Sequence, residues 1–276
     1  MKSMERVIKK QILIGVFLVI LLMGCCSTLR AQRTPKIEKT RVLLTGFEPY
    51  GKWDKNPSSE IVKSLDGKVI GGAKIYGIEL PVSFREAGRN LSKTLNEIKP
   101  HVLISIGLSP RVTGIEVERV AINVMDAKIP DNAGYQPVDV PIVRNGETAY
   151  FATIPIKEIV DAMQQKGIPS YVSNTAGTFL CNFVMYGGLY HSDSSKFPMK
   201  SGLIHVPCLP GQVVDESTPS MSLELMIEAI EEARLHEDSL GGAIELMITG
   251  LPAGIGTVGR NSRCSAGAGR ERDSWA

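Results

Sequence analysis

The stretch "GIPSYVSNTAGTFLCNFVMYG", residues 167–187, contains a strand pattern, a turn and a helix pattern in direct succession. Residues 171–177 are predicted to form a strand that runs into a turn, and a helical pattern follows Thr178. Strand, turn and helix in this order form the repeating unit of α/β proteins. Cys181 falls in the first turn or so of the helix, where two interpretations stay open. It is either a nucleophile or one of the small buried thiols that are common in protein cores.

The same alternation of short β-rich runs and longer helical patterns extends outward from this stretch, from about residue 40 to residue 235. Strands are predicted at residues 41–47, 74–82, 101–107, 116–124, 171–177 and 202–207. Helices are predicted at residues 56–65, 84–98, 154–167 and 222–235, with a further helix after Thr178. Such alternation favours a parallel sheet covered on both faces. The fold class is therefore predicted as α/β: a single three-layer α/β/α domain with a twisted, largely parallel central sheet.

Composition divides the chain into four parts. Residues 1–24 are predicted to be an export signal and residues 25–39 a linker. The α/β domain is predicted over residues 40–245. Residues 246–276 are rich in Gly, Ala, Ser and Arg and lack an apolar period, which predicts a disordered tail.

The N-terminal segment has the pattern of an export signal. Met1–Lys10 is basic and Gln11–Met23 is almost wholly apolar, but the apolar run is shorter than the roughly 20 residues that span a membrane. "LLMGC" at residues 21–25 resembles a bacterial lipoprotein signal, which predicts lipid attachment at Cys25 and a place in the cell envelope. Cleavage after Ala31, which would release a periplasmic or secreted protein, and an uncleaved N-terminal anchor remain open alternatives.

The charge of the chain depends on this segment. It holds four basic residues and one acidic residue, so its removal lowers the formal net charge from +2 to −1. No basic stripe interleaved with aromatic residues occurs elsewhere in the sequence. We therefore expect no nucleic-acid partner, and no membrane contact except through the N-terminal lipid or anchor.

Cysteine and histidine spacing argues against metal sites and disulfide frameworks. Beyond the N-terminal pair, only Cys181, Cys208 and Cys264 remain, an odd and widely spaced set. The histidines form no HxxxH or HxH pattern and no CxxC accompanies them, so no metal and no cofactor is expected. Cys208 lies three residues after His205 and is either an inert buried thiol or a partner for Cys181 under oxidising conditions.

Polar residues are predicted to gather at one edge of the sheet, because ligands of α/β sheets bind beyond the carboxyl ends of the strands. His205 lies near the end of its strand, Cys181 begins a helix, and residues 45–51 form the loop that leaves the first strand. The dipole and NH groups of a helix N-terminus favour a thiolate and could stabilise an oxyanion. A lone histidine in an apolar strand is also a common core residue, so both interpretations stand at this point.

Four blocks of sequence carry a resemblance to a known family. They are "VLLTGFEPYGKWDKNPS" (42–58), "VERVAINVMDAKIPDNAGYQPVD" (117–139), the opening stretch at 167–187, and "GLIHVPCLP" (202–210). Together they resemble the pyroglutamyl peptidase I (pyrrolidone-carboxylate peptidase) family of cysteine peptidases, over about residues 40–240. The resemblance implies a hydrolase that removes N-terminal pyroglutamate from peptides without a cofactor, with pyroglutamyl peptides as its partners.

The resemblance also implies a catalytic triad. Cys181 matches the nucleophile, His205 the histidine that takes and returns the proton, and Glu118 the acid that orients the imidazole. The reaction would pass through an acyl-enzyme.

Seven residues match substrate-pocket positions of the family: Phe47, Tyr50, Asn56, Lys128, Ile129, Phe179 and Leu180. A flat neutral lactam needs an apolar slot and a polar edge that pairs with its amide. Three of these positions depart from the family, which usually has phenylalanine in place of Tyr50, often arginine in place of Lys128 and often valine in place of Leu180. Lysine lacks the planar fork of arginine, and the tyrosine hydroxyl needs a hydrogen-bond partner.

These departures keep two alternatives open. One is a lipoprotein that binds pyroglutamyl peptides or lactams without turnover, and the other is a hydrolase of a different cyclic amide. The family is mostly cytoplasmic and often forms dimers or tetramers, so the resemblance allows a homo-oligomer. It disagrees with the N-terminus on location, and we expect an exported protein because the signal pattern is direct.

Overall fold

The computed structural model describes residues 40–195, 197–214 and 217–233. The predictions for residues 1–24, 25–39 and 246–276, and for lipid attachment at Cys25, lie outside the described residues. Among the helices of the described part, none combines the length and the apolar character that crossing a membrane requires.

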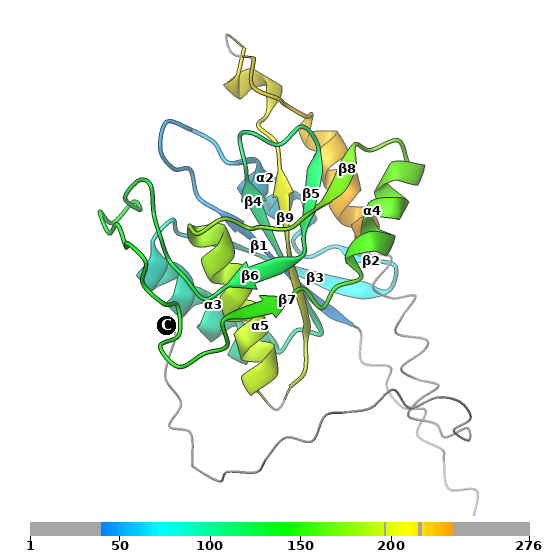
Figure 1. Cartoon of the computed structure of the whole chain (residues 1–276). Coiled ribbons are helices and arrows are strands. Elements are labelled where there is room, and N and C mark those ends of the chain that lie inside the picture. The colour runs from blue at the N-terminus through cyan, green and yellow to red at the C-terminus, as the bar shows by residue number, and fades with distance from the viewer. Residues whose placement is uncertain (1–39, 196, 215–216, 234–276) are drawn as a thin grey trace, which may run out of the picture. The chain divides into compact units, whose positions relative to one another are not determined.

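A seven-stranded mixed sheet forms the centre of the described structure (Figure 1). Its strands, in spatial order, are β2 (Val69–Ile70), β3 (Ala73–Leu80), β1 (Arg41–Phe47), β4 (Val102–Leu108), β9 (Lys200–Val206), β5 (Ile115–Glu118) and β8 (Ser170–Ser173). Neighbouring strands are parallel except for β2 against β3 and β5 against β9. The prediction of a largely parallel sheet is confirmed.

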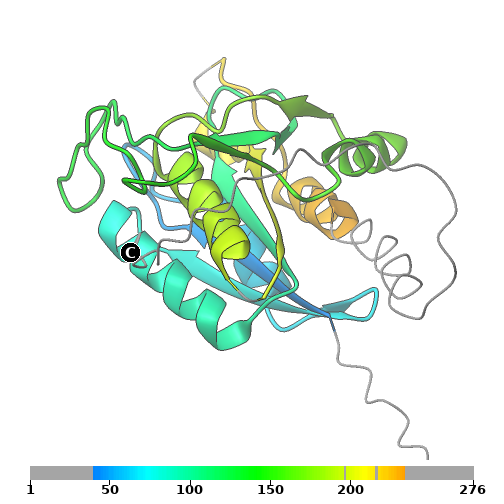
Figure 2. The same ribbon diagram turned by 60° about the horizontal axis from the view of Figure 1, so that its bottom comes forward.

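Helices cover both faces of the sheet (Figures 1 and 2). One face packs against α2 (Pro57–Leu65), α4 (Ile156–Gln165) and a helix at residues 223–233. The other face packs against α3 (Phe84–Ile98) and α5 (Leu180–Ser194). Strand residues alternate between the two layers: in β1, Val42 and Leu44 join the first core and Leu43 joins the second. The predicted three-layer α/β/α architecture is confirmed.

The predicted strand at 116–124 is wrong as one continuous element. It is two strands in different sheets: β5 ends at Glu118, and β6 (Val120–Ile122) pairs with β7 (Ala149–Phe151) in a small sheet against α5. Arg119 lies at the break, where its N–H donates to the Ser173 carbonyl and its own carbonyl accepts from Ala152. The chain therefore leaves the central sheet directly after Glu118.

The connection from β8 to α5 also differs from a simple strand–turn–helix unit. Because β5 is antiparallel to β9 and parallel to β8, β8 runs against the direction of the central strands. Residues 174–179 cross from the end of β8 to the start of α5 (Figure 1). This crossing brings the first turn of α5 to the carboxyl ends of β4 and β9.

Candidate active site

Four residues lie side by side across four neighbouring strands. In the strand register, Gly107 of β4 pairs with His205 of β9, His205 pairs with Glu116 of β5, and Glu116 pairs with Tyr171 of β8. Residues paired in register project to the same face of a sheet. The flanking residues Ile106, Ile204 and Val117 belong to the core on the face of α2 and α4. The row itself therefore faces α5 on the other side of the sheet.

The imidazole of His205 is held by a buried carboxylate. Its Nδ1 lies 2.7 Å from Oε1 of Glu118, whose side chain is fully buried. The second carboxylate oxygen of Glu118 is buried and has no hydrogen-bond partner among the described residues. A carboxylate that accepts from Nδ1 keeps the proton on that nitrogen and leaves Nε2 available for chemistry.

Cys181 lies on the other side of the imidazole. It is the second residue of α5 and is hydrogen-bonded to His205. Both side chains close around Gly107: a Cβ added there would lie 2.5 Å from the Cys181 sulfur and 3.2 Å from Cδ2 of His205. The absence of a side chain at Gly107 makes room for the thiol beside the ring.

The charge state of His205 follows from its neighbours. Burial by itself lowers its pKa, but the charge of Cys181, its hydrogen bond to the ring, and Glu118 outweigh that effect. The pKa of His205 is raised to about 10. An imidazolium between a sulfur and a carboxylate is therefore the resting arrangement, as in an activated thiol nucleophile.

Hydrogen bonds hold the start of α5 in place. Asn182 is fully buried; its Oδ1 accepts from Ile122 N–H at 2.9 Å and its Nδ2 donates to the carbonyls of Ile122 and Val124, each at 2.9 Å. Thr178 donates its hydroxyl to the Asp126 carbonyl at 2.7 Å. No side chain caps the helix at Phe179, so among the described residues no capping side chain accepts from its first N–H groups, which are the kind of donors that bind anions.

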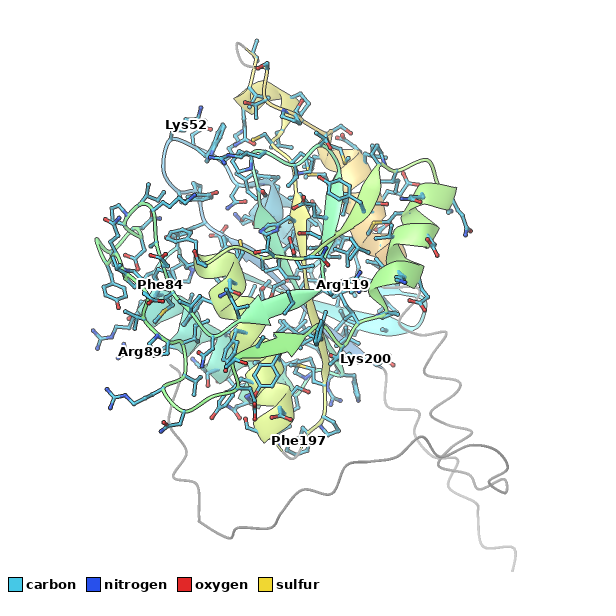
Figure 3. All side chains as sticks on the ribbon, in the orientation of Figure 1. Lys52, Phe84, Arg89, Arg119, Phe197 and Lys200 are labelled. Atoms are coloured by element: carbon cyan, nitrogen blue, oxygen red, sulfur yellow. The ribbon has the colours of Figure 1, made fainter. Side chains whose placement is uncertain are left out.

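Aromatic residues line the approach to the thiol. The ring centre of Phe179 lies 6.3 Å from that of Tyr50 and 5.4 Å from that of Phe84. Phe84, labelled in Figure 3, begins α3. The Tyr50 hydroxyl donates to the Leu108 carbonyl at 3.4 Å, which supplies the partner that the sequence required. Its pKa is raised, by burial first and then by the charges of Cys181 and Cys208. Tyr50 and Phe179 are thus brought together beside Cys181.

Asn56 fixes the loop that follows β1. It is the N-cap of α2, where its Oδ1 accepts from the N–H and hydroxyl of Ser58 at 3.1 and 2.8 Å. Its Nδ2 donates to the Glu48 carbonyl at 3.1 Å. Phe47, at the end of β1, is buried in the core beneath this loop. Asn56 therefore shapes the loop from behind.

The three remaining predicted pocket residues differ in exposure. Leu180 is buried in the core, whereas Lys128 and Ile129 are exposed on the segment between β6 and β7. Within the described residues, neither Lys128 nor Ile129 forms a hydrogen bond or ion pair with Cys181 or His205. Their roles in binding stay predictions.

Sequence reasoning missed Gly107, Glu116 and Glu48 as parts of this region. Glu48 joins two loops: its Oε1 accepts from Val82 N–H at 2.9 Å and from Asn132 at 2.8 Å. The position of Glu48, a charged residue directly after the strand predicted at 41–47, was the available signal. For Gly107 and Glu116 the signal is strand register, which the sequence does not display.

Glu116, Glu118 and His205 have ligand atoms within 4.8 Å of one another, a group that could hold a metal ion in the part of the chain that the structure describes. Nδ1 of His205 already bonds to Glu118 at 2.7 Å, so a metal there would have to displace that contact. The arrangement favours proton holding over metal binding, and the expectation of no metal stays a prediction.

Cys208 is a second thiol near this region. It is fully buried, in a small cluster with Leu108 and Val213. Cys181 and Cys208 are both reduced thiols in the structure, and the hypothesis that they pair stays a prediction about oxidising conditions.

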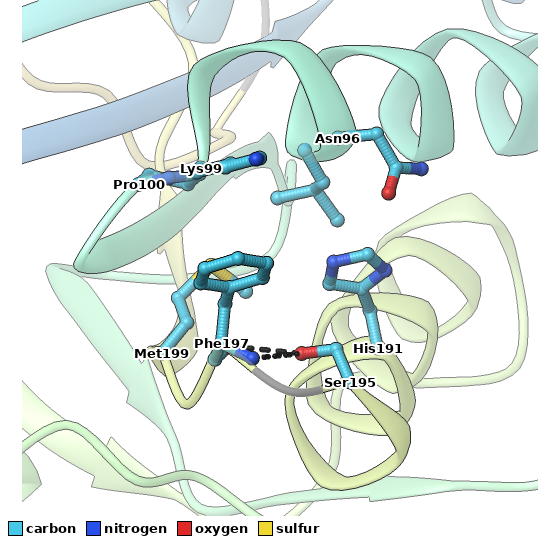
Figure 4. Close-up of a pocket in the computed structure, with 8 residues that line it drawn as sticks. Asn96, Lys99, Pro100, His191, Ser195, Phe197 and Met199 are labelled. Atoms are coloured by element: carbon cyan, nitrogen blue, oxygen red, sulfur yellow. Dashed lines mark hydrogen bonds between the residues drawn. The ribbon is translucent and has the colours of Figure 1, made fainter.

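A separate small pocket lies near the amino-terminal ends of β4 and β9, away from Cys181, and Figure 4 shows the residues that line it. It is formed where α3 and α5 end and where the chain enters β4 and β9, and its lining residues are Leu95, Asn96, Lys99, Pro100, His191, Ser195, Phe197 and Met199. The Lys99 ammonium lies 4.7 Å from the centre of the Phe197 ring. This pocket holds no thiol, and we assign it no part in the chemistry.

Comparisons with known proteins agree with the geometry. The sequence profile of the pyroglutamyl peptidase family matches residues 40–236. Pyrrolidone-carboxylate peptidase of Pyrococcus furiosus is 48% identical over 198 residues, 70% of this chain and 95% of that protein. The Thermococcus litoralis protein of the same name is 48% identical over 199 residues, 70% of this chain and 90% of that protein.

Solved structures give the same result. Pyrrolidone carboxyl peptidase from Thermococcus litoralis has a TM-score of 0.72 at 46% identity, covering 74% of this chain and 96% of that one. The Pyrococcus furiosus structure has a TM-score of 0.71 at 46% identity, covering 73% and 100%. Fold and site thus define a cysteine-type hydrolase. Within that class, the chain belongs to the pyroglutamyl peptidase family.

Proposed function

We propose that this protein is an exopeptidase that removes an N-terminal pyroglutamyl residue from peptides, with Cys181, His205 and Glu118 as its catalytic triad. The observation that carries the proposal is the position of His205, with Glu118 2.7 Å from Nδ1 and Cys181 hydrogen-bonded to the ring. The base thus adjoins both the nucleophile and the orienting acid, as triad catalysis requires.

The first half of the reaction acylates the thiol. In the resting pair the Cys181 proton is already on Nε2 of His205, and the thiolate sulfur attacks the carbonyl carbon that joins pyroglutamate to the next residue. Open N–H groups at the start of α5 stabilise the oxyanion. The C–N bond then breaks as the leaving amine takes the proton from Nε2, which leaves a thioester on Cys181.

The second half releases pyroglutamate. Water loses a proton to Nε2 of His205 as its oxygen bonds to the thioester carbon. The C–S bond then breaks and the sulfur leaves as a thiolate beside the protonated imidazole, which restores the resting pair. Glu118 remains ionised throughout and keeps Nδ1 protonated.

The predicted pocket residues suit a neutral lactam. The rings of Tyr50 and Phe179 adjoin the thiol and supply an apolar wall, while Asn56 and Phe47 support the loop behind them. A site of this kind selects a substrate by its ring and amide edge and needs no pairing with a charged N-terminus.

The test is the hydrolysis of pyroglutamyl aminomethylcoumarin by the full chain. A prolyl amide of the same dye is the matched substrate, since it has the five-membered ring without the lactam carbonyl, and Cys181→Ala is the blank. We expect turnover of the pyroglutamyl amide alone, with and without reductant. Binding without turnover would favour the lactam-binding alternative, and turnover of other cyclic amides alone would favour the second alternative. Turnover that requires reductant would support pairing of Cys181 with Cys208.

We further propose that the protein is exported and attached to the cell envelope by lipid at Cys25. The basic, apolar and small-residue segments of residues 1–25 support this location. In bacteria that express the full chain, labelled fatty acid is expected on the protein in the envelope fraction and is expected to be absent from Cys25→Ala. Unlabelled protein in the periplasm would indicate cleavage after Ala31, and unlabelled cytoplasmic protein would contradict export.

A further inference from the structure

Glu116 occupies the position between two polar side chains in the register of the sheet. It pairs with His205 on one side and with Tyr171 on the other. Its Oε2 lies 3.9 Å from Nδ1 of His205, and its carboxylate is hydrogen-bonded by Tyr171. The Tyr171 hydroxyl in turn accepts from Thr113 N–H at 3.4 Å, which ties it to the loop after β4. The catalytic histidine therefore faces a second carboxylate that is itself held in place.

The two carboxylates relate differently to the ring. Glu118, at 2.7 Å and fully buried, makes the hydrogen bond that sets the tautomer. Glu116, at 3.9 Å and with its side chain 19% exposed, is too distant for a hydrogen bond but close enough for a strong charge interaction. Glu116 thus adds negative charge beside Nδ1 and leaves the orientation of the ring to Glu118.

The need for a second charge arises in one half of the reaction. Before acylation, the imidazolium of His205 has the Cys181 thiolate beside it. In the thioester the sulfur is neutral, so the imidazolium that forms when water is deprotonated has lost that partner. Among the described residues, the carboxylates within 4 Å of Nδ1 at this stage are those of Glu116 and Glu118.

We propose that Glu116 is a positioning residue for deacylation: its carboxylate, fixed by Tyr171, stabilises the His205 imidazolium while water attacks the thioester on Cys181. The inference rests on the proposed peptidase function. Glu116 exchanges no proton in the proposed reaction; it acts through the charge on His205.

The titration of Glu116 is consistent with this role. Burial raises its pKa, the hydrogen bond from Tyr171 lowers it, the charge of Glu118 raises it, and that of His205 lowers it. The net shift is upward, so the carboxyl ionises at a higher pH than an exposed glutamate. Within the described residues, the titratable groups that act on its pKa are Tyr171 of β8, Glu118 of its own strand and His205 of β9. Protonation of Glu116 as the pH falls should therefore weaken deacylation.

The experiment separates the two halves of the reaction. A p-nitrophenyl ester of pyroglutamate acylates the thiol without protonation of its leaving group, so its steady-state rate reports deacylation, whereas an anilide reports acylation. For Glu116→Gln we expect the ester burst to persist, the ester steady-state rate to fall about tenfold, and the anilide kcat/KM to fall less. Tyr171→Phe should change both substrates in the same direction with a smaller effect.

Two control variants are compared with Glu116→Gln. Glu97→Gln, on the exposed face of α3, should change neither substrate, because its side chain is 62% exposed. Glu118→Gln should slow both halves. Equal losses on ester and anilide in Glu116→Gln, or no loss on either, would overturn the proposal.

A measurement without turnover keeps this inference distinct from the peptidase function. In Cys181→Ala, which lacks the thiolate, NMR titration of the His205 ring should give a pKa about 1 pH unit lower after Glu116→Gln. An unchanged titration would overturn the role of Glu116 even if the enzyme is active. Absence of activity on every pyroglutamyl substrate, with the shift present, would instead overturn the proposed function alone.

Discussion

Replacement of Glu118 by glutamine is expected to lower kcat about 10⁴-fold, the loss typical of the same change in a serine triad. The amide can present its NH₂ group to Nδ1 of His205, which then becomes an acceptor. The proton moves to Nε2, and this nitrogen can no longer take the proton from Cys181. The imidazolium also loses the carboxylate that lies 2.7 Å away.

The pH profile of the same variant gives a second result. In the wild type, the pKa of His205 is raised to about 10, so the acid form that protonates the leaving amine is lost only as the pH rises through about 10. The raised pKa also makes the stability of the fold depend on pH. The charged ring contributes fully to stability below its ordinary pKa near 6.5, and this contribution disappears as the pH rises through about 10. In Glu118→Gln the basic limb of kcat/KM should move to lower pH.

The measurement is kcat/KM from pH 5 to 11 for wild type, Glu118→Gln and the exposed control Glu97→Gln, with circular dichroism to monitor the fold. A loss of less than tenfold in Glu118→Gln, with the basic limb unchanged, would contradict its assignment as the orienting acid. The carboxylate next to consider would then be Glu116, whose Oε2 lies 3.9 Å from Nδ1.

The fold could be predicted where the signals are local. Asn56 and the proline that follows it indicate the start of α2. Gly167, with a φ of +76°, follows the end of α4 as expected. Strand direction is not local, since a buried strand reads the same whether its neighbour is parallel or antiparallel. The reversal of β5 and β8 and the break at Arg119 therefore appear only in the structure.

The residues of the site likewise fall into those that the sequence could predict and those that it could not. Cys181 and His205 stand out in the sequence because each lies at the end of a recognisable element, and Glu118 follows from the family resemblance. Gly107 and Glu116 become visible only through the register of β4, β9 and β5, since nothing in their own neighbourhoods marks them. Residues that act by adjoining a catalytic group across strands are therefore the ones that sequence patterns miss.

Replacement of Gly107 by alanine is expected to lower kcat/KM by about 10²- to 10³-fold without a comparable loss of stability. The added Cβ would lie 2.5 Å from the Cys181 sulfur, closer than atoms in real structures approach. Because Asn182 ties the start of α5 to Ile122 of β6 by two hydrogen bonds and to Val124 by a third, we expect the helix to stay in place and the sulfur to rotate away from His205. A displacement of about 1 Å costs roughly 10² in rate.

The matched control is Gly211→Ala. An added Cβ there meets no atom within 4 Å, and neither glycine has a φ in the left-handed region, so backbone strain is absent at both sites. Anilide kinetics and thermal melting of the two variants separate a misplaced sulfur from a general loss of folding. If Gly107→Ala kept its activity within about fivefold of the Gly211→Ala value, the thiol would have room to pass the added methyl. Catalysis would then not require the close packing of Cys181 and His205 around Gly107.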